Sequence, residues 1–169
     1  MKSLPVAALT AEAFAPYGQV IEASEAARHF PINGGSTERY HDLAQVELAP
    51  GSHPLISIFR AKPRQLPYRI GMLERHPLGS QAFVPMNGRA YLVAVAIPGE
   101  QPRSEDVRVF LARGDQGVNY AAGVWHHPLM ALEAVSDFLV VDRGGPGNNC
   151  DEQNLPEPLQ VLTACVTPD

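Results

Sequence analysis

The sequence predicts a mainly β fold, a sandwich or a barrel, in one domain that spans residues 1–169. Sixteen prolines and fourteen glycines interrupt the chain at short intervals and limit it to short elements. Between these breaks lie about seven short runs rich in branched and aliphatic residues, which is typical of all-β domains. The chain is long enough to bury one core, and no repeat or linker indicates a second domain.

The N-terminal part predicts a short helix, a loop and a strand. Thr10 is a suitable N-cap for a helix that runs through Phe14. Residues 28–40 surround an Asn-Gly-Gly sequence and predict a loop. Residues 55–59 (LISIF) are a β-branched run between prolines, which predicts a buried strand.

The middle of the chain predicts three strands and a second helix. The strands are expected at residues 66–73, 81–84 and 89–97, and the last of these (RAYLVAVAI) has the strongest pattern. Apolar residues at helical spacing follow Ser104, and Gly114 stands where a C-terminal cap belongs, so a helix is expected between them.

The C-terminal part predicts the remaining strands of the domain. They are expected at residues 124–135, 137–141 and 159–166. The tail over residues 144–169 has the composition of a loosely organised segment.

Charge and cysteine content restrict the partners. The formal net charge of −5 argues against a nucleic-acid partner, which needs a basic face. The apolar run at the N-terminus is broken by Pro5 and followed by Glu12, so neither a signal peptide nor a membrane partner is expected. Cys150 and Cys165 have no motif spacing that indicates a disulfide framework. A cytoplasmic location is therefore expected.

The first group of polar side chains that indicates chemistry is Glu74, His76 and Gln81. Side chains alternate along a strand, so Glu74 and His76 point one way and Arg75 the other. A carboxylate and an imidazole on one inward face suit a divalent cation, and Gln81 can add an amide oxygen. The alternative is a pair of ordinary surface charges beside a histidine that precedes a proline turn.

The second group is the Trp125-His126-His127 sequence. His126 is the candidate for the same site, and His127 should face the opposite side of the strand. A histidine after a tryptophan is also a common hydrogen-bonded packing residue, and this reading stays open.

The spacing of these residues resembles the first cupin motif, in which two histidines, a glutamate and a glycine follow one another. Here Glu74 and His76 take the histidine positions, Gln81 replaces the glutamate, and Gly88 follows at the expected distance. The leading glycine is replaced by Tyr68. The end of the second motif, a glycine three residues before a histidine, matches the sequence that ends at His126.

Longer segments of the chain resemble the ureidoglycolate lyase family of allantoin degradation, also described as ureidoglycolate hydrolase. The resemblance runs from about residue 14 to 158. Its most specific strings are ERHPLGSQAF and GVWHHPL, and the other matching segments are FAPYGQVIE, INGG, ERYHDLA, LISIFRA, DFLVVDRGG and NNCDE. One departure is Ala121-Ala122, where relatives often carry histidine or arginine.

The resemblance implies a cupin-like β-barrel (a double-stranded β-helix) with short peripheral helices, a homodimer, and ureidoglycolate as the small-molecule substrate. It also implies activity supported by a divalent metal, with nickel favoured. The reaction eliminates urea and leaves glyoxylate, which requires a base near the hydroxyl group and an acid near the ureido nitrogen.

The residues can be assigned to this chemistry as hypotheses. The metal ligands are predicted to be Glu74, His76, Gln81 and His126, of which Glu74, His76 and His126 are also the catalytic candidates. Arg39 and His41 share a face if their segment is extended, and with Gln81 they are the candidates for substrate binding. A salt-bridged loop at a dimer contact is an equally good explanation for Arg39 and His41.

Two other functions are compatible with the sequence. The same ligands can activate water for amidohydrolysis of ureidoglycolate, with release of ammonia and carbon dioxide. A non-catalytic cupin that binds a small acid is the second alternative, because fold does not fix function.

Overall fold

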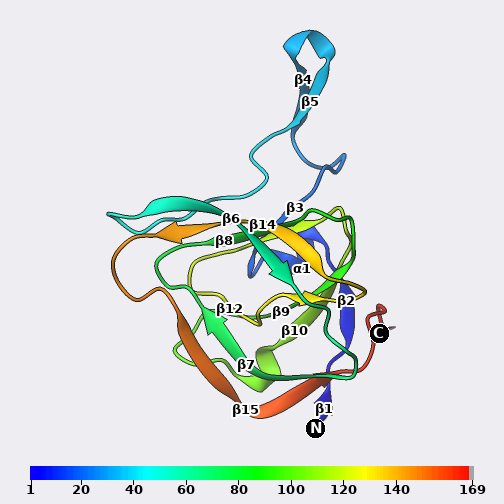
Figure 1. Ribbon diagram of the computed structural model, residues 1–169, viewed down its shortest axis with the longest axis vertical. Coiled ribbons are helices and arrows are strands. Elements are labelled where there is room, and N and C mark those ends of the chain that lie inside the picture. Colours follow the sequence, from blue (N-terminus) through cyan, green and yellow to red (C-terminus); the bar gives the residue numbers. More distant parts are fainter. Residues whose placement is uncertain (168–169) are drawn as a thin grey trace.

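A computed structural model of the protein describes residues 1–167. Strands dominate it, with one short α-helix and two 3-10 helices, so the predicted mainly β class is confirmed (Figure 1). In chain order the elements are β1 (Lys2–Ser3), β2 (Val6–Ala8), α1 (Ala11–Phe14), β3 (Gly18–Ile21), β4 (His29–Ile32), η1 (Asn33–Gly35), β5 (Thr37–Tyr40), β6 (His53–Ala61), β7 (Tyr68–Arg75), β8 (Gln81–Pro85), β9 (Tyr91–Ala96), η2 (Ser104–Asp106), β10 (Arg108–Ala112), β11 (Gly117–Tyr120), β12 (Trp125–His126), β13 (Met130–Ala131), β14 (Ser136–Gly144) and β15 (Asp151–Val161).

Two sheets form the body of the molecule. The larger has the order β1-β15-β7-β12-β9-β10-β2, with β13 also paired to β9, and the smaller has the order β3-β11-β8-β14-β6. The larger sheet curls, and the smaller sheet lies across it to close the barrel interior (Figure 1). This arrangement is the cupin-like β-barrel that the sequence predicts.

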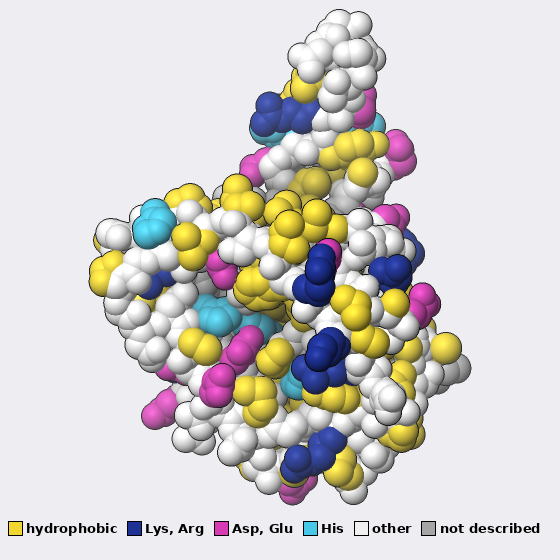
Figure 2. Space-filling model, viewed as in Figure 1, with side chains coloured by type: hydrophobic (Ala, Val, Ile, Leu, Met, Phe, Trp, Pro, Cys, Tyr) yellow, Lys and Arg dark blue, Asp and Glu magenta, His cyan; other side chains and the backbone are white. Residues whose placement is uncertain are grey.

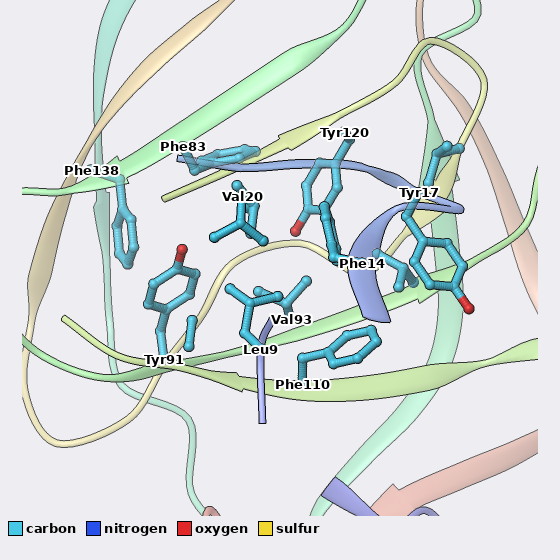
Figure 3. Close-up of a cluster of buried hydrophobic side chains, with 14 of the residues drawn as sticks. Leu9, Phe14, Tyr17, Val20, Phe83, Tyr91, Val93, Phe110, Tyr120 and Phe138 are labelled. Atoms are coloured by element: carbon cyan, nitrogen blue, oxygen red, sulfur yellow. The ribbon is translucent and has the colours of Figure 1, made fainter. Parts of the chain in front are cut away.

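Strand β9 fixes the centre of the larger sheet because both of its faces are buried. Its odd-numbered residues over 91–95 belong to the core between the two sheets, together with Phe14, Phe83 and Phe138 (Figure 3). Its even-numbered residues over 92–96 belong to a second cluster on the other face of the larger sheet. Burial on both sides explains the uninterrupted apolar run of this strand. Strand β9 also sets the position of β12, which pairs with it and carries His126.

The two predicted helices have different outcomes. The helix capped by Thr10 is confirmed, because its Oγ1 accepts a hydrogen bond from the backbone N–H of Ala13 at 3.1 Å. The helix predicted from Ser104 is wrong: a 3-10 turn there leads into strand β10, which pairs with β9 and β2. Val109 faces one apolar cluster and Phe110 faces the other, so both faces of this strand are apolar. The strand therefore lacks the alternation of polar and apolar residues, and its apolar positions happen to match helical spacing.

Residues 28–40 form a β-hairpin rather than a loop, so the loop prediction is wrong. Strands β4 and β5 pair antiparallel, and the turn between them is closed by Asn33 and Gly34 at φ values of 53° and 68°. Figure 1 shows this hairpin projecting from the barrel (blue to cyan), and residues 28–41 are called the arm below. Short strands of mixed polarity in the arm gave no alternating pattern that could reveal them.

Strand β6 is present where predicted, but the expectation that it is buried is wrong. Ile56 is 76% exposed and Ile58 is 58% exposed. Among residues 1–167 the strand pairs only with β14, and it therefore forms an edge of the smaller sheet. A run of β-branched residues is the same in an edge strand and in a central one, so the sequence alone could not distinguish them.

The C-terminal part is more ordered than its composition indicates. The prediction of a loosely organised tail is wrong over β15, which pairs with β7 along most of its length. The strand predicted at residues 159–166 ends at Val161, and the one predicted at 124–135 divides into the short strands β12 and β13. Within the described residues, no helix has the length and apolar character needed to cross a membrane.

Candidate functional site

Glu74 and His126 face each other on neighbouring strands of the larger sheet. They are direct partners in the antiparallel pairing of β7 and β12, and His76 lies just beyond the end of β7. Arg75 points to the other side, where its guanidinium group lies 4.6 Å from the ring centre of Trp125 and binds Asp151 at 2.8 Å. The predicted alternation along this strand is confirmed.

The side chains of Glu74, His76 and His126 converge on one point. Each offers a ligand atom, and these atoms all lie within 4.8 Å of one another. Nε2 of His126 lies 3.5 Å from Oε1 of Glu74, and the two imidazole ring centres are 5.1 Å apart. His126 is buried, whereas 20% of the Glu74 side chain is exposed, so the cluster opens to solvent on the Glu74 side.

Hydrogen bonds to the backbone fix both histidine rings in the same tautomer. Nδ1 of His76 lies 2.7 Å from the carbonyl oxygen of Asn149, and Nδ1 of His126 lies 3.1 Å from that of Val124. A carbonyl oxygen only accepts, so each Nδ1 carries the hydrogen and each Nε2 presents a lone pair. Both Nε2 atoms are buried and have no hydrogen-bond partner within the described chain.

Gln81 approaches from the smaller sheet. It begins β8 and pairs with Tyr120, whose ring stacks on that of His126 with centres 4.3 Å apart and planes at 13°. The amide nitrogen of Gln81 donates a hydrogen bond to Oδ2 of Asp142 at 3.1 Å, which orients the amide group. The amide oxygen Oε1 is buried and makes no hydrogen bond within residues 1–167.

The donor set fits a divalent transition metal. Three buried acceptor atoms (Nε2 of His76, Nε2 of His126 and Oε1 of Gln81) lack partners, and an unsatisfied buried polar group is costly. Two imidazoles with oxygen donors suit nickel, manganese, iron or zinc better than calcium. A second group, Glu74 with Cys150 and Glu152, also has the spacing for an ion, but Cys150 and Glu152 are exposed.

The electrostatic surroundings favour a charged Glu74 beside a neutral His126. Burial, the largest influence, lowers the pKa of His126 below its usual value, although Glu74 acts in the opposite direction. Burial is the largest influence on Glu74 and disfavours its charged form, but the neighbouring imidazoles of His126, His76 and His127 outweigh it and lower the pKa of Glu74. At neutral pH the site therefore holds a carboxylate and a neutral buried imidazole.

His127 lies on the other side of its strand, as predicted. Its ring packs edge-on against Tyr68 with centres 5.4 Å apart, and its Nδ1 lies 2.8 Å from the carbonyl oxygen of Pro128. It lines a separate pocket together with Tyr68 and Arg69. Burial lowers the pKa of His127, which fits a neutral packing residue.

Arg39 and His41 are on the arm and do not line the pocket that contains Glu74. Arg39 is an exposed residue of β5. His41 packs against Phe30 with ring centres 5.6 Å apart and lines a different pocket at the base of the arm. The structure brings Glu74, His76 and His126 together and leaves Arg39 and His41 apart from them.

The cluster opens into a pocket of about 500 Å³ that the sequence did not reveal. Glu74 lines it together with Arg60, Lys62 and Arg64 from the end of β6 and the loop that follows. Figure 2 shows histidine side chains in the hollow of this face, with acidic side chains on one side and basic ones on the other. No motif or alternation in the sequence connects these cations to the cluster, and the fold places them at the same pocket.

Comparisons with known proteins identify the family of this chain. The family model described as "Ureidoglycolate lyase" matches residues 1–162. A ureidoglycolate lyase of Burkholderia mallei (strain NCTC 10229) is 58% identical over 160 residues, which is 94% of this chain and 93% of the relative. That of Burkholderia cepacia is 60% identical over 88% of this chain and 84% of its own length. That of Azotobacter vinelandii is 55% identical over 96% of this chain and 98% of its own length. This chain therefore belongs to the ureidoglycolate lyase family.

Proposed function

We propose that this protein is a carbon–nitrogen lyase that eliminates urea from ureidoglycolate and leaves glyoxylate. The observation that carries the proposal is the convergence of Glu74, His76 and His126 at the opening of a pocket in a chain of this family. In the substrate, one carbon atom bears a hydroxyl group, a carboxylate and a ureido nitrogen. Elimination removes the hydroxyl proton, forms the aldehyde carbonyl, breaks the carbon–nitrogen bond and adds a proton to the departing nitrogen.

Glu74 is the residue best placed to move these protons. It lines the pocket, and its lowered pKa keeps it ionised at neutral pH, so a carboxylate oxygen can accept the hydroxyl proton. The hydroxyl group and the ureido nitrogen are bonded to the same carbon atom. The carboxyl group formed on Glu74 can therefore return the proton to the nitrogen without moving far, and no covalent intermediate is needed.

The remaining members of the cluster bind and orient. The buried Nε2 atoms of His76 and His126 and the amide oxygen of Gln81 would hold a divalent cation together with Glu74. The chemistry that such an ion supplies when bound is Lewis-acid stabilisation of negative charge. The backbone carbonyls that bind each Nδ1 keep both rings in the orientation that this role needs. We propose nickel as the ion.

Product analysis tests the proposed reaction. The purified protein, supplied with each enantiomer of ureidoglycolate, is expected to release glyoxylate and urea in equal amounts. Urea, ammonia and glyoxylate are measured in the same sample. Ammonia in place of urea would instead establish amidohydrolysis, and the absence of turnover with both enantiomers would favour a non-catalytic acid-binding cupin.

Metal binding should depend on the histidines whose Nε2 atoms are buried and not on the exposed thiol. Replacing His76 with alanine is expected to weaken nickel binding about 100-fold, because one of few ligands is lost. Cys150→Ser removes the sulfur of the second group of potential ligands and should leave nickel affinity within about 3-fold. Calorimetric titration of the metal-free protein measures both affinities. The reverse pattern would place the ion at Cys150.

We further propose that the protein acts as a homodimer in the cytoplasm. The exposed face of edge strand β6 supports a dimer, because Ile56 and Ile58 would otherwise remain in water beside unpaired backbone groups. The arm also projects away from its own barrel, as Figure 1 shows. The free thiols Cys150 and Cys165 are compatible with a reducing compartment.

The dimer gives Arg39 and His41 a route to substrate, because an arm from one subunit can approach the pocket of the other. Inactive Arg39→Ala protein mixed with inactive His126→Ala protein is then expected to recover about a quarter of normal activity. Only the mixed dimers, with one complete site each, contribute. Light scattering of the unmodified protein should give twice the monomer mass of 18.3 kDa. A monomer, or a mixture without recovery, would contradict this role of the arm.

A further inference from the structure

Two cations line the same pocket as Glu74 and have no carboxylate partner within the described residues. The pocket that contains Glu74 is lined by Arg60, Lys62 and Arg64, and most of its other lining is apolar. Arg60 is paired with Asp137 through two hydrogen bonds of 2.8 and 3.0 Å, so its charge is offset. Lys62 and Arg64 form no salt bridge within residues 1–167.

The position of Arg64 is held by packing rather than by charge. Its guanidinium group lies 5.3 Å from the ring centre of Tyr68, and its backbone N–H donates to the carbonyl of Ala131 at 2.8 Å. Lys62 is one of only two lysines in the chain. The protein as a whole carries a net charge of −5. The two unpaired cations make the electrostatic potential near them more positive than that of the molecule as a whole.

We propose that Lys62 and Arg64 bind the carboxylate group of the substrate. This inference rests on the proposed function, in which a small acid enters the pocket. Glu74 and the two cations line the same pocket, so a substrate held by its carboxylate would present its hydroxyl-bearing carbon to Glu74. Figure 2 shows basic side chains beside the hollow that contains the histidines, in agreement with this division between binding and chemistry. A 2-hydroxy acid is therefore preferred over its neutral amide.

The test removes the two charges and compares an acid with its amide. Lys62→Met and Arg64→Gln change exposed side chains, so the fold should tolerate them. Arg69→Gln is the matched control, because Arg69 is exposed, has no salt bridge within the described residues and lines a different pocket. The double variant Lys62→Met/Arg64→Gln is expected to raise KM for ureidoglycolate roughly 10- to 100-fold, with kcat changed much less.

Direct binding separates this inference from the proposed reaction. Glycolate and glycolamide are titrated calorimetrically into the unmodified protein, the double variant and Arg69→Gln. The double variant should lose glycolate affinity roughly 10-fold or more and keep its affinity for glycolamide. Equal glycolate binding by the double variant and the control would overturn the inference, even if ureidoglycolate is turned over. Loss of glycolate binding in a protein without turnover would reject the reaction and keep the carboxylate site.

Discussion

Replacing His126 with alanine is expected to lower the turnover of ureidoglycolate about 100-fold or more. The substitution removes a buried Nε2 lone pair that faces Glu74 and has no other partner in the described chain. Glyoxylate release by folded protein measures the effect.

His127→Ala is the matched control for this substitution. His127 is the next residue and is also buried, but its ring packs against Tyr68 on the opposite side of the strand. Its removal should lower turnover less than about 10-fold, with a loss of stability from the cavity. Circular dichroism and thermal unfolding of both variants distinguish lost chemistry from lost folding. Equal loss of turnover in two folded variants would contradict the assignment of His126.

The second large effect is expected at Gly18, where a side chain cannot be accommodated. Its φ is +145°, and a Cβ atom built there would lie 1.8 Å from the carbonyl oxygen of Asn119 on strand β11. Gly18→Ala should therefore lower the free energy of unfolding by more than about 3 kcal/mol, because strand backbone must move. Gly18 pairs with Tyr120, which stacks on His126, so the remaining folded protein should also lose activity.

Gly34→Ala separates the clash from backbone strain. Gly34 has a positive φ of +68°, but nothing lies within 4 Å of the position of a Cβ atom. This variant should lose only about 1–2 kcal/mol, the cost of the left-handed backbone conformation. Urea unfolding of both proteins gives the comparison. A loss at Gly18 no greater than that at Gly34 would show that β3 and β11 are not packed as described.

The parts of the fold that depend on local pattern could be predicted from the sequence. Residues 89–97 contain an apolar run typical of a buried strand, and the structure buries Tyr91–Ala96 on both faces; the cap at Thr10 is a local hydrogen bond. The helix expected from Ser104 was wrong because both faces of β10 are buried, and pairing with β9 and β2 decided its conformation. The exposure of β6 depends on which strands lie beside it, and the local sequence pattern does not indicate those neighbours.

In the candidate site too, the residues set by local pattern could be predicted, and those set by the tertiary fold could not. Alternation along one strand placed Glu74 and His76 on the same side, and the spacing of the second cupin motif indicated His126, which pairs with Glu74 in the structure. The roles of Asn149 and of Lys62 could not be predicted, because each lies in a loop where no strand alternation or motif spacing indicates which way it faces. Asn149 holds His76 only because β15 turns back along β7, in a segment whose composition indicated little order.

The most direct test of the account is a crystal structure of the nickel-loaded protein measured at the nickel absorption edge. The account predicts one strong anomalous peak about 2.0–2.2 Å from Nε2 of His76 and Nε2 of His126, with oxygen atoms of Glu74 and Gln81 completing the protein ligands. A peak at Cys150 and Glu152 instead, with the two histidine Nε2 atoms left without an ion, would contradict it.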